Sequence, residues 1–411
     1  MNLEWRLAWR NVWRNPRRTG LTVSATVFAV GLLVLMSALS TGMWEKIIDD
    51  SVSMGSGHVT LTGPNYLEER TLEEFTYLDA PLAARLEENP AVAGFAPRVN
   101  AFGLLSEADV TRGVMVIGVD PAAERTVSSL PDRIESGRFL EKGKTREIVL
   151  GGRLAEILGV KIGDQVLLYS VAYSLESAYD LFSVAGIMRL PNPSLDRGLA
   201  LVSLADAQAF FVYGDRISEV AIRASEASAS TALAEQLGSS LDPEKIEAHA
   251  WPEVMPDLAQ TVVIDKLGMY MMLAILVIVV AFGIFNTILM AVLERKREFG
   301  VVLALGLRPR AIFRIVYFES ILLAGVGLML GLLVAIPGVL YLQANPIPLT
   351  NSEEMAAAFA MVGSDPVIYA KLIPENPIFS GLTILLVALL AAFYPAVRAS
   401  RGKPVDVLRS L

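Results

Sequence analysis

The sequence contains no cysteine and only two histidines. Without cysteine the chain cannot form a disulfide or a thiolate metal site, and it carries no N-terminal cysteine for lipid attachment. His58 and His249 stand alone, and neither belongs to a spacing that is typical of metal ligands. No G-x-S-x-G sequence occurs either. We therefore expect no enzymatic site, no metal and no cofactor bound by this chain.

A phosphate-binding loop is also missing. The stretch GRFLEKGKT, residues 137–145, ends in Gly-Lys-Thr, but five residues separate Gly137 from Gly143. A P-loop has four residues at that place and then begins a helix. The residues that follow here, REIVLGG, are β-branched and apolar and predict a strand. We expect a charged turn before a strand, so any dependence on ATP would involve another chain.

Charge is absent from four long runs: residues 19–44, 267–293, 320–352 and 376–397. The chain is 53% hydrophobic, and its mean hydropathy of +0.49 is unusual for a soluble protein. Crossing a hydrocarbon core of roughly 30 Å takes about 20 helical residues, so each run predicts a transmembrane helix. The first run exceeds the roughly 7–15 apolar residues of a signal peptide, which indicates an uncleaved anchor.

Basic residues predict the orientation. Residues 1–18, 294–314 and 398–411 together hold 15 basic and 4 acidic residues, whereas residues 44–266 hold 19 basic and 34 acidic ones. Segments rich in Lys and Arg stay on the cytoplasmic side of a membrane. We therefore expect both termini in the cytoplasm and the large acidic segment outside.

The N-terminal segment EWRLAWRNVWRNPRR has a helical pattern. Tryptophans recur at every fourth position and arginines form a second stripe. Aromatic rings beside cations favour a helix that lies in the inner-leaflet interface, although flanking charge that obeys the positive-inside rule is an alternative. We expect contact with the membrane interface from Trp5, Trp9, Trp13, Arg10 and Arg14.

The predicted fold is a membrane protein with four transmembrane α-helices and a large α+β periplasmic domain inserted between the first and second. Strand and helix patterns alternate in the outside segment, and its middle part is rich in strand patterns. The expected parts are a cytoplasmic interfacial helix (1–18), spans at 19–44, 267–293, 315–342 and 376–397, a periplasmic domain (45–266) with an inserted β-rich subdomain (about 106–216), a cytoplasmic coupling helix (294–314), a periplasmic loop (343–375) and a cytoplasmic tail (398–411).

The segment between the second and third spans is the most informative one. ERKREFGVVLALGLRPRAIFRIVYFES, residues 294–320, begins with charges and continues with a helical apolar patch at Phe299, Val302, Leu303 and Leu305. A loop that only connects two spans could be far shorter. Small side chains in the patch would allow another backbone or a groove to approach closely. They are Gly300, Ala304 and Gly306.

This segment resembles the E-R-x-R-E-[IF]-G-[IV]-[LV]-x-A-[LI]-G motif of the FtsX-like permeases, which are membrane subunits of MacB-type (type VII) ABC transporters. Residues 137–168 resemble the periplasmic core pattern of that family, and WRNVWRNPRRTGLT resembles its N-terminal signature. Within the family, SGHVTLTG and residues 186–208 are most similar to lipoprotein-releasing permeases of the LolC/LolE type.

The resemblance implies that a coupling helix docks in a groove of a separate ATPase subunit. The residues expected to serve this coupling are Arg297, Glu298, Phe299, Gly300, Ala304, Leu305, Gly306 and Arg308. Leu303 departs from the Arg or Lys that is frequent there. Glu319 matches an acidic position at the start of the third span. A carboxylate at mid-membrane costs about 2.5–3.5 kcal/mol, so we expect an ion pair or helix-terminus contact near the interface, with gating as the alternative.

The function implied by the resemblance is that of a non-catalytic permease subunit in the bacterial inner membrane. ATP and Mg²⁺ would be bound by a cytoplasmic ABC ATPase dimer, and a second permease copy or a paralogue would complete the transporter. The expected substrate is a lipoprotein or a lipid-like molecule, passed to a periplasmic chaperone or adaptor; nucleic acid is not expected. The alternatives are a split MacB-like efflux permease and an FtsX-like regulator of a periplasmic partner that transports nothing.

Overall fold

The computed structural model describes residues 3–14, 16–349, 354, 357–359 and 364–401. The chain divides into two compact units. The helical unit comprises residues 1–44, 263–348 and 367–411, and the α+β unit comprises residues 45–262 and 349–366. The α+β unit is therefore drawn mainly from the segment between the first and second long helices.

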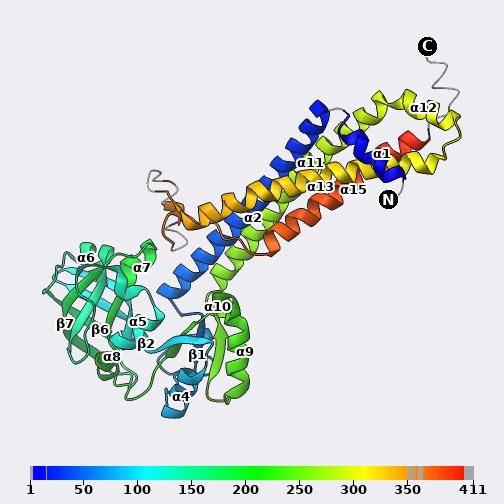
Figure 1. Ribbon diagram of the computed structural model, residues 1–411. Coiled ribbons are helices and arrows are strands. Elements are labelled where there is room, and N and C mark those ends of the chain that lie inside the picture. Colours follow the sequence, from blue (N-terminus) through cyan, green and yellow to red (C-terminus); the bar gives the residue numbers. More distant parts are fainter. Residues whose placement is uncertain (1–2, 15, 350–353, 355–356, 360–363, 402–411) are drawn as a thin grey trace. The chain divides into compact units, whose positions relative to one another are not determined.

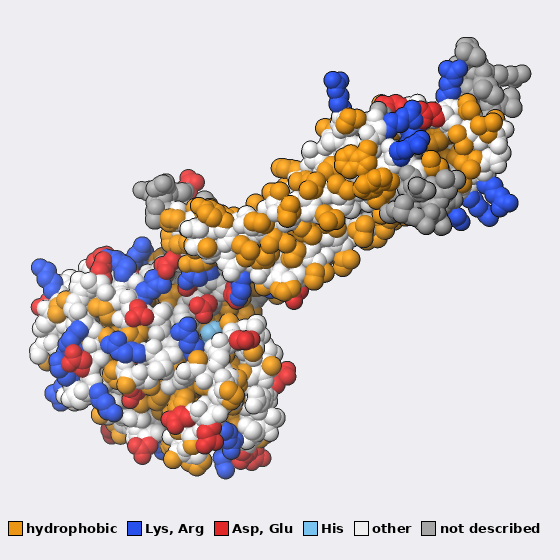
Figure 2. Space-filling view, viewed as in Figure 1, with side chains coloured by type: hydrophobic (Ala, Val, Ile, Leu, Met, Phe, Trp, Pro, Cys, Tyr) orange, Lys and Arg blue, Asp and Glu red, His pale blue; other side chains and the backbone are white. Residues whose placement is uncertain are grey.

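Four long helices make up most of the described helical unit (Figure 1): α2 (Pro16–Met54), α11 (Pro256–Glu294), α13 (Pro309–Ala344) and α15 (Glu375–Ser400). Each is long and apolar enough to cross a membrane, which confirms the prediction of four candidate spans. A shorter helix, α1 (Leu3–Val12), lies against α13, and α13 packs along α15. Figure 2 shows apolar side chains over most of the visible face of this unit, as contact with lipid requires.

Two glycines allow α13 to approach α2 closely. A Cβ atom at Gly327 would lie 2.6 Å from Cβ of Thr26, and one at Gly331 would lie 2.7 Å from Cβ of Val30. Residues four positions apart share one face of a helix, so both contacts belong to a single seam. Small residues at such seams are typical of helix packing in membranes, where close backbone contact replaces the hydrophobic effect.

Among the described residues, six strands of the α+β unit close into a barrel. The ring runs through β2 (Val92–Glu107), β3 (Val110–Val119), β8 (Leu199–Ser203), β5 (Glu147–Gly151), β7 (Ser177–Met188) and β6 (Gln165–Val171), and β6 returns to β2. Closure leaves these strands with few free edges. Apolar side chains fill the interior, among them Leu105, Ile148, Leu168 and Phe182.

The first half of β2 belongs to a second part of the same sheet. There β2 pairs with β9 (Glu219–Ala224), which continues to β1 (Val59–Thr62) and β10 (Glu247–Ala250). The helices α4 (Ala80–Glu88) and α9 (Ser230–Ser240) share an apolar core with these strands. The β-rich region is thus continuous with the rest of the α+β unit through β2.

The remaining elements are short. They are α3 (Tyr66–Glu69), α5 (Pro121–Val127), η1 (Leu130–Arg133), β4 (Ile134–Gly137), α6 (Gly152–Leu158), α7 (Pro193–Gly198), α8 (Leu204–Phe210), η2 (Ala227–Ala229), α10 (Trp251–Val254), α12 (Lys296–Ala304), β11 (Ile347–Pro348) and β12 (Val367–Ile368). Residues 137–145 connect β4 to β5. The predicted strand after Gly-Lys-Thr is confirmed, and the helix of a P-loop does not follow it.

A single buried guanidinium joins four segments of the α+β unit. Arg98, on β2, is 2% exposed and binds Glu124 of α5 through two hydrogen bonds of 2.6 and 3.1 Å. Its Nη1 lies 3.5 Å from Oε1 of Glu219 on β9 and donates to the carbonyl of Gly55, just after α2. Burial opposes the charge, yet the carboxylates of Glu124 and Glu219 raise the pKa of Arg98 above its usual value.

We predict that Arg98→Met lowers the free energy of unfolding of the α+β unit by about 3–5 kcal/mol, because both carboxylates would stay buried without their cation. Thermal or urea unfolding of the purified protein measures this loss. Arg112, exposed on β3, is the matched control, and Arg112→Met should cost less than about 0.5 kcal/mol. Equal losses for the two variants would contradict the role assigned to Arg98.

Candidate coupling site

The short helix α12 lies between the second and third long helices, where the coupling helix was predicted. It follows α11 almost directly and ends at a glycine with φ of +94°, Gly306. The Gly306 N–H donates to the Leu303 carbonyl, and the Leu307 N–H donates to the Val302 carbonyl. These two bonds form a Schellman motif, which stops a helix at a left-handed glycine. Pro309 then occupies the first turn of α13, as proline prefers.

One face of α12 is anchored in the helical unit. Phe299 is 8% exposed and packs in a cluster with residues of three long helices, including Ile288 of α11, Val316 of α13 and Ala396 of α15. Gly300 beside it is buried as well. The guanidinium of Arg295 lies over the Phe299 ring, 5.1 Å from its centroid. These contacts fix the orientation of α12 on the bundle.

The opposite face of α12 is free in this chain. Val301 is 44% exposed, Val302 37% and Leu305 82%. Exposed polar and small residues surround them: Arg297, Glu298, Ala304, Gly306 and Arg308. An apolar strip ringed by charges is typical of a surface that binds a protein partner.

The predicted apolar patch is therefore divided between two faces. Phe299 and Leu303 are four residues apart and point into the bundle, whereas Val301 and Leu305 are four residues apart and point outward. The sequence analysis missed Val301, although helical spacing alone would have separated the two pairs. Phe299 and Gly300 can support docking only indirectly, by holding the helix in place.

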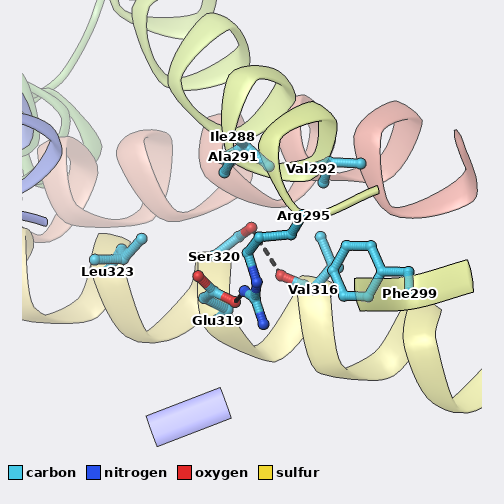
Figure 3. A pocket seen from close by; sticks show the side chains of 9 residues that line it. All are labelled: Ile288, Ala291, Val292, Arg295, Phe299, Val316, Glu319, Ser320 and Leu323. Carbon is cyan, nitrogen blue, oxygen red and sulfur yellow. Dashed lines mark hydrogen bonds and ion pairs between the residues drawn. The ribbon is translucent and has the colours of Figure 1, made fainter. Parts of the chain in front are cut away.

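Four charged side chains link α12 to its neighbours, and we call them the charge chain. Arg14 donates to both carboxylate oxygens of Glu298, at 2.7 and 3.1 Å. The Arg295 Nε lies 3.4 Å from Glu298, and its Nη1 donates to Oε2 of Glu319 at 2.9 Å. Figure 3 shows Arg295 and Glu319 pointing toward each other beside Phe299. The chain connects the segment before α2, α12 and α13.

The pKa values at the exposed end of the charge chain follow from these contacts. The hydrogen bond from Arg14 lowers the pKa of Glu298, and the same bond raises the pKa of Arg14. A carboxylate with a lowered pKa keeps its partner above that pKa and loses it as the pH falls through it. The pair is thus retained at neutral pH and lost only under acidic conditions.

Glu319 is 7% exposed and forms the ion pair that the sequence analysis expected for it. Arg295, its partner, was missed, although its place three residues before Glu298 was a readable signal. The cavity around the pair has a volume of about 10 Å³, which is room for one water at most. Its lining residues appear in Figure 3. No substrate or nucleotide fits there, and among the described residues no His, Asp and Glu cluster could hold a metal ion.

The predicted membrane-interface residues lie on and after α1. Trp9 and Trp13 are about half exposed, and their rings meet edge to face with centroids 6.0 Å apart. Arg10 is exposed beside them, while Arg14 pairs with Glu298. The Trp5 side chain lies outside the described part of the structure. Exposed Trp9, Arg10 and Trp13 suit a membrane interface, and this assignment stays a prediction.

Four apolar helices, a large α+β unit and an anchored short helix between two spans define a membrane permease of the ABC transporter class. The sequence profile of the MacB-like periplasmic core domain matches residues 19–240, and that of the FtsX-like permease C-terminal domain matches residues 270–404. The chain belongs to this family of MacB-type, FtsX-like ABC transporter permeases. The resemblance stated from the sequence motifs is confirmed.

Relatives with assigned names fall into two groups. The lipoprotein-releasing system transmembrane protein LolE of Haemophilus influenzae is 25% identical over 399 residues, covering 94% of this chain and 93% of the relative. LolC of Neisseria meningitidis is 24% identical over 343 residues, 79% of each chain. The macrolide export ATP-binding/permease protein MacB of Bartonella henselae is 23% identical over 404 residues, covering 94% of this chain but 56% of the relative.

We predict that the Arg295–Glu319 pair stabilises the helical unit. Arg295→Met should lower its free energy of unfolding by about 1–3 kcal/mol, the range for losing a charged hydrogen bond. The double variant Arg295→Met/Glu319→Gln should lose less than the sum of the two single changes, by about 0.5–3 kcal/mol. Thermal unfolding in detergent measures the cycle, with exposed Arg310→Met as the control. Strict additivity would show that the two side chains do not act together.

Proposed function

We propose that this chain is the membrane subunit of an ATP-driven transporter that releases lipoproteins from the outer leaflet of the bacterial inner membrane. Relatives of the LolC and LolE type, aligned over most of the chain, support this substrate class. The basic segments at 1–18, 294–314 and 398–411 support a topology with both termini and α12 in the cytoplasm. The α+β unit would then work in the periplasm.

The observation that carries the ATP-driven part is the exposed face of α12. A helix pinned by Phe299 and by the charge chain, with Val301, Val302 and Leu305 left in solvent, is built to receive a partner. That partner would be a cytoplasmic ABC ATPase dimer, which holds ATP and Mg²⁺ and hydrolyses the nucleotide. Force applied to α12 would enter α11 and α13 directly, because α12 follows one and precedes the other. A second permease copy or a paralogue would complete the complex.

Leu305→Asp is the sharpest test of docking, because this side chain is 82% exposed and buries nothing within the chain. We predict that it abolishes co-purification of the ATPase while the melting temperature stays unchanged, since a charge placed in an apolar interface loses its water. Leu175→Asp, at a position 76% exposed in the α+β unit, is the matched control and should keep the ATPase bound. ATPase recovery with Leu305→Asp equal to that of the control would refute docking through α12.

Charge reversal at Glu298 is a less clean test than the motif suggests. Glu298 holds Arg14 and Arg295, so Glu298→Arg would disturb the anchoring of α12 together with its outer face. Gly300→Trp is unsuitable for the same reason, because Gly300 is buried against the bundle. Both variants should lower stability as well as docking.

The substrate is tested by depletion of the protein followed by separation of inner and outer membranes. We expect mature lipoproteins to accumulate in the inner membrane, and re-expression of Leu305→Asp should fail to correct this. Normal transfer of lipoproteins in depleted cells would exclude the proposed substrate. Sensitivity to macrolides with normal lipoprotein transfer would favour the efflux function carried in the name of the MacB relative.

A further inference from the structure

The loop between α13 and α15 is a hairpin whose two ends belong to different units. At its base, β11 (Ile347–Pro348) pairs with β12 (Val367–Ile368) in antiparallel register. Both strands belong to the helical unit, whereas residues 349–366 belong to the α+β unit. The first contact beyond the strands is the bond from the Leu349 N–H to the Pro366 carbonyl, at 2.8 Å. The loop therefore adds a connection between the two units besides α2 and α11.

The base of the hairpin is held firmly in the helical unit. The Lys371 N–H donates to the Ala38 carbonyl of α2 at 2.9 Å. Gly42 faces the same strand so closely that a Cβ atom there would lie 2.6 Å from the Tyr369 carbonyl oxygen. Backbone-to-backbone packing of this kind leaves no room for sliding. Movement of the α2–α13–α15 helices must carry the base of the hairpin with it.

The returning arm of the hairpin tip is held in the α+β unit by side chains of two adjacent residues. Ser364 is 1% exposed and donates from Oγ to Oδ2 of Asp50, at 2.6 Å. Asp365 accepts two hydrogen bonds of 3.0 Å from the guanidinium of Arg133, at the end of η1. Asp50 belongs to the last turns of α2, which lie in the α+β unit.

These contacts are of a kind that can open at low cost. The Arg133 and Asp365 side chains are 24% and 41% exposed, so water can replace each partner; exposed pairs contribute about 0.2–1 kcal/mol to stability. Asp50 also binds Lys46 through its other oxygen, so its carboxylate keeps a cation when Ser364 leaves. Of the described residues in 349–366, none belongs to a buried apolar cluster of the α+β unit.

We propose that Ser364 and Asp365 form a releasable latch on Asp50 and Arg133, closed in the nucleotide-free transporter and open in its ATP-bound state. While closed, the latch carries the motion of α13 and α15 into the α+β unit; once open, it lets that unit move with α2 and α11 alone. Arg133 is a positioning residue in this device and touches no substrate. The proposal rests on the proposed action of a partner ATPase but not on the identity of the substrate.

The absence of cysteine makes the latch directly testable. In Asp132→Cys/Pro366→Cys the two introduced thiols are the only ones in the chain, and both latch residues between them stay intact. We expect efficient cross-linking by a short bis-maleimide in the nucleotide-free complex with its ATPase. With a non-hydrolysable ATP analogue the yield should fall about tenfold, which corresponds to a shift of about 1.4 kcal/mol.

A control pair separates latch opening from general changes in reactivity. Glu135 and Arg189 lie 3.2 Å apart within the α+β unit, so Glu135→Cys/Arg189→Cys should cross-link equally in both nucleotide states. A yield for Asp132→Cys/Pro366→Cys that is the same with and without nucleotide would overturn the proposal. The assay contains no lipoprotein, so its result and the outcome of the lipoprotein experiment are independent.

Charge reversal tests the latch in the permease alone. Asp365→Arg, added to the Asp132→Cys/Pro366→Cys protein, should lower cross-linking in the absence of nucleotide to the level of the ATP-bound state. Adding Arg133→Glu as well should restore it, because the swapped charges attract again. Unchanged cross-linking with Asp365→Arg would show that this ion pair does not close the loop, and a failure of the swap to restore it would show a merely structural disturbance.

Discussion

Burial of the Arg98 guanidinium is the constraint on which the α+β unit depends. A cation this far from water is stable only if carboxylates and a carbonyl surround it, and here each of them comes from a different segment. None of the segments can leave without exposing a charge to an apolar core. One of them is the residue that follows α2, a continuous helix of 39 residues that starts in the helical unit. The end of that helix is thus joined to the strands by electrostatics and not by apolar packing alone.

The polar connections of the chain differ mainly in their exposure to water, and exposure sets how readily each can break. The Arg98 cluster is almost fully buried. The charge chain runs from an exposed pair at Arg14 and Glu298 to a buried carboxylate at Glu319. The contacts of Arg133 with Asp365 are partly exposed throughout. A transporter that cycles needs joints that hold and joints that release, and this gradient supplies both kinds within one chain.

Much of the architecture could be predicted from the sequence because its signals are local. A charge-free run reports a span by its length, and the charges and apolar residues after Glu294 report a short helix by their periodicity. The closure of the barrel could not be predicted, since β6 returns to β2 about sixty residues earlier in the chain and no local pattern encodes that pairing. Arg98 reads as an exposed strand residue until its partners are known. The pair of Arg14 with Glu298 joins residues 284 positions apart. Such contacts depend on the assembled bundle.

The long strand β2 has a thermodynamic consequence for the α+β unit. Its first half hydrogen-bonds to β9 and its second half to β3 and β6, so one stretch of sixteen residues is structural in both the open sheet and the barrel. Neither part can melt while the other keeps its full set of ladder bonds. The two parts therefore form one cooperative folding unit, with a single unfolding transition in place of two. A destabilising substitution in the barrel is then felt equally by the strands around β1, and the unit responds to stress as an undivided solid body.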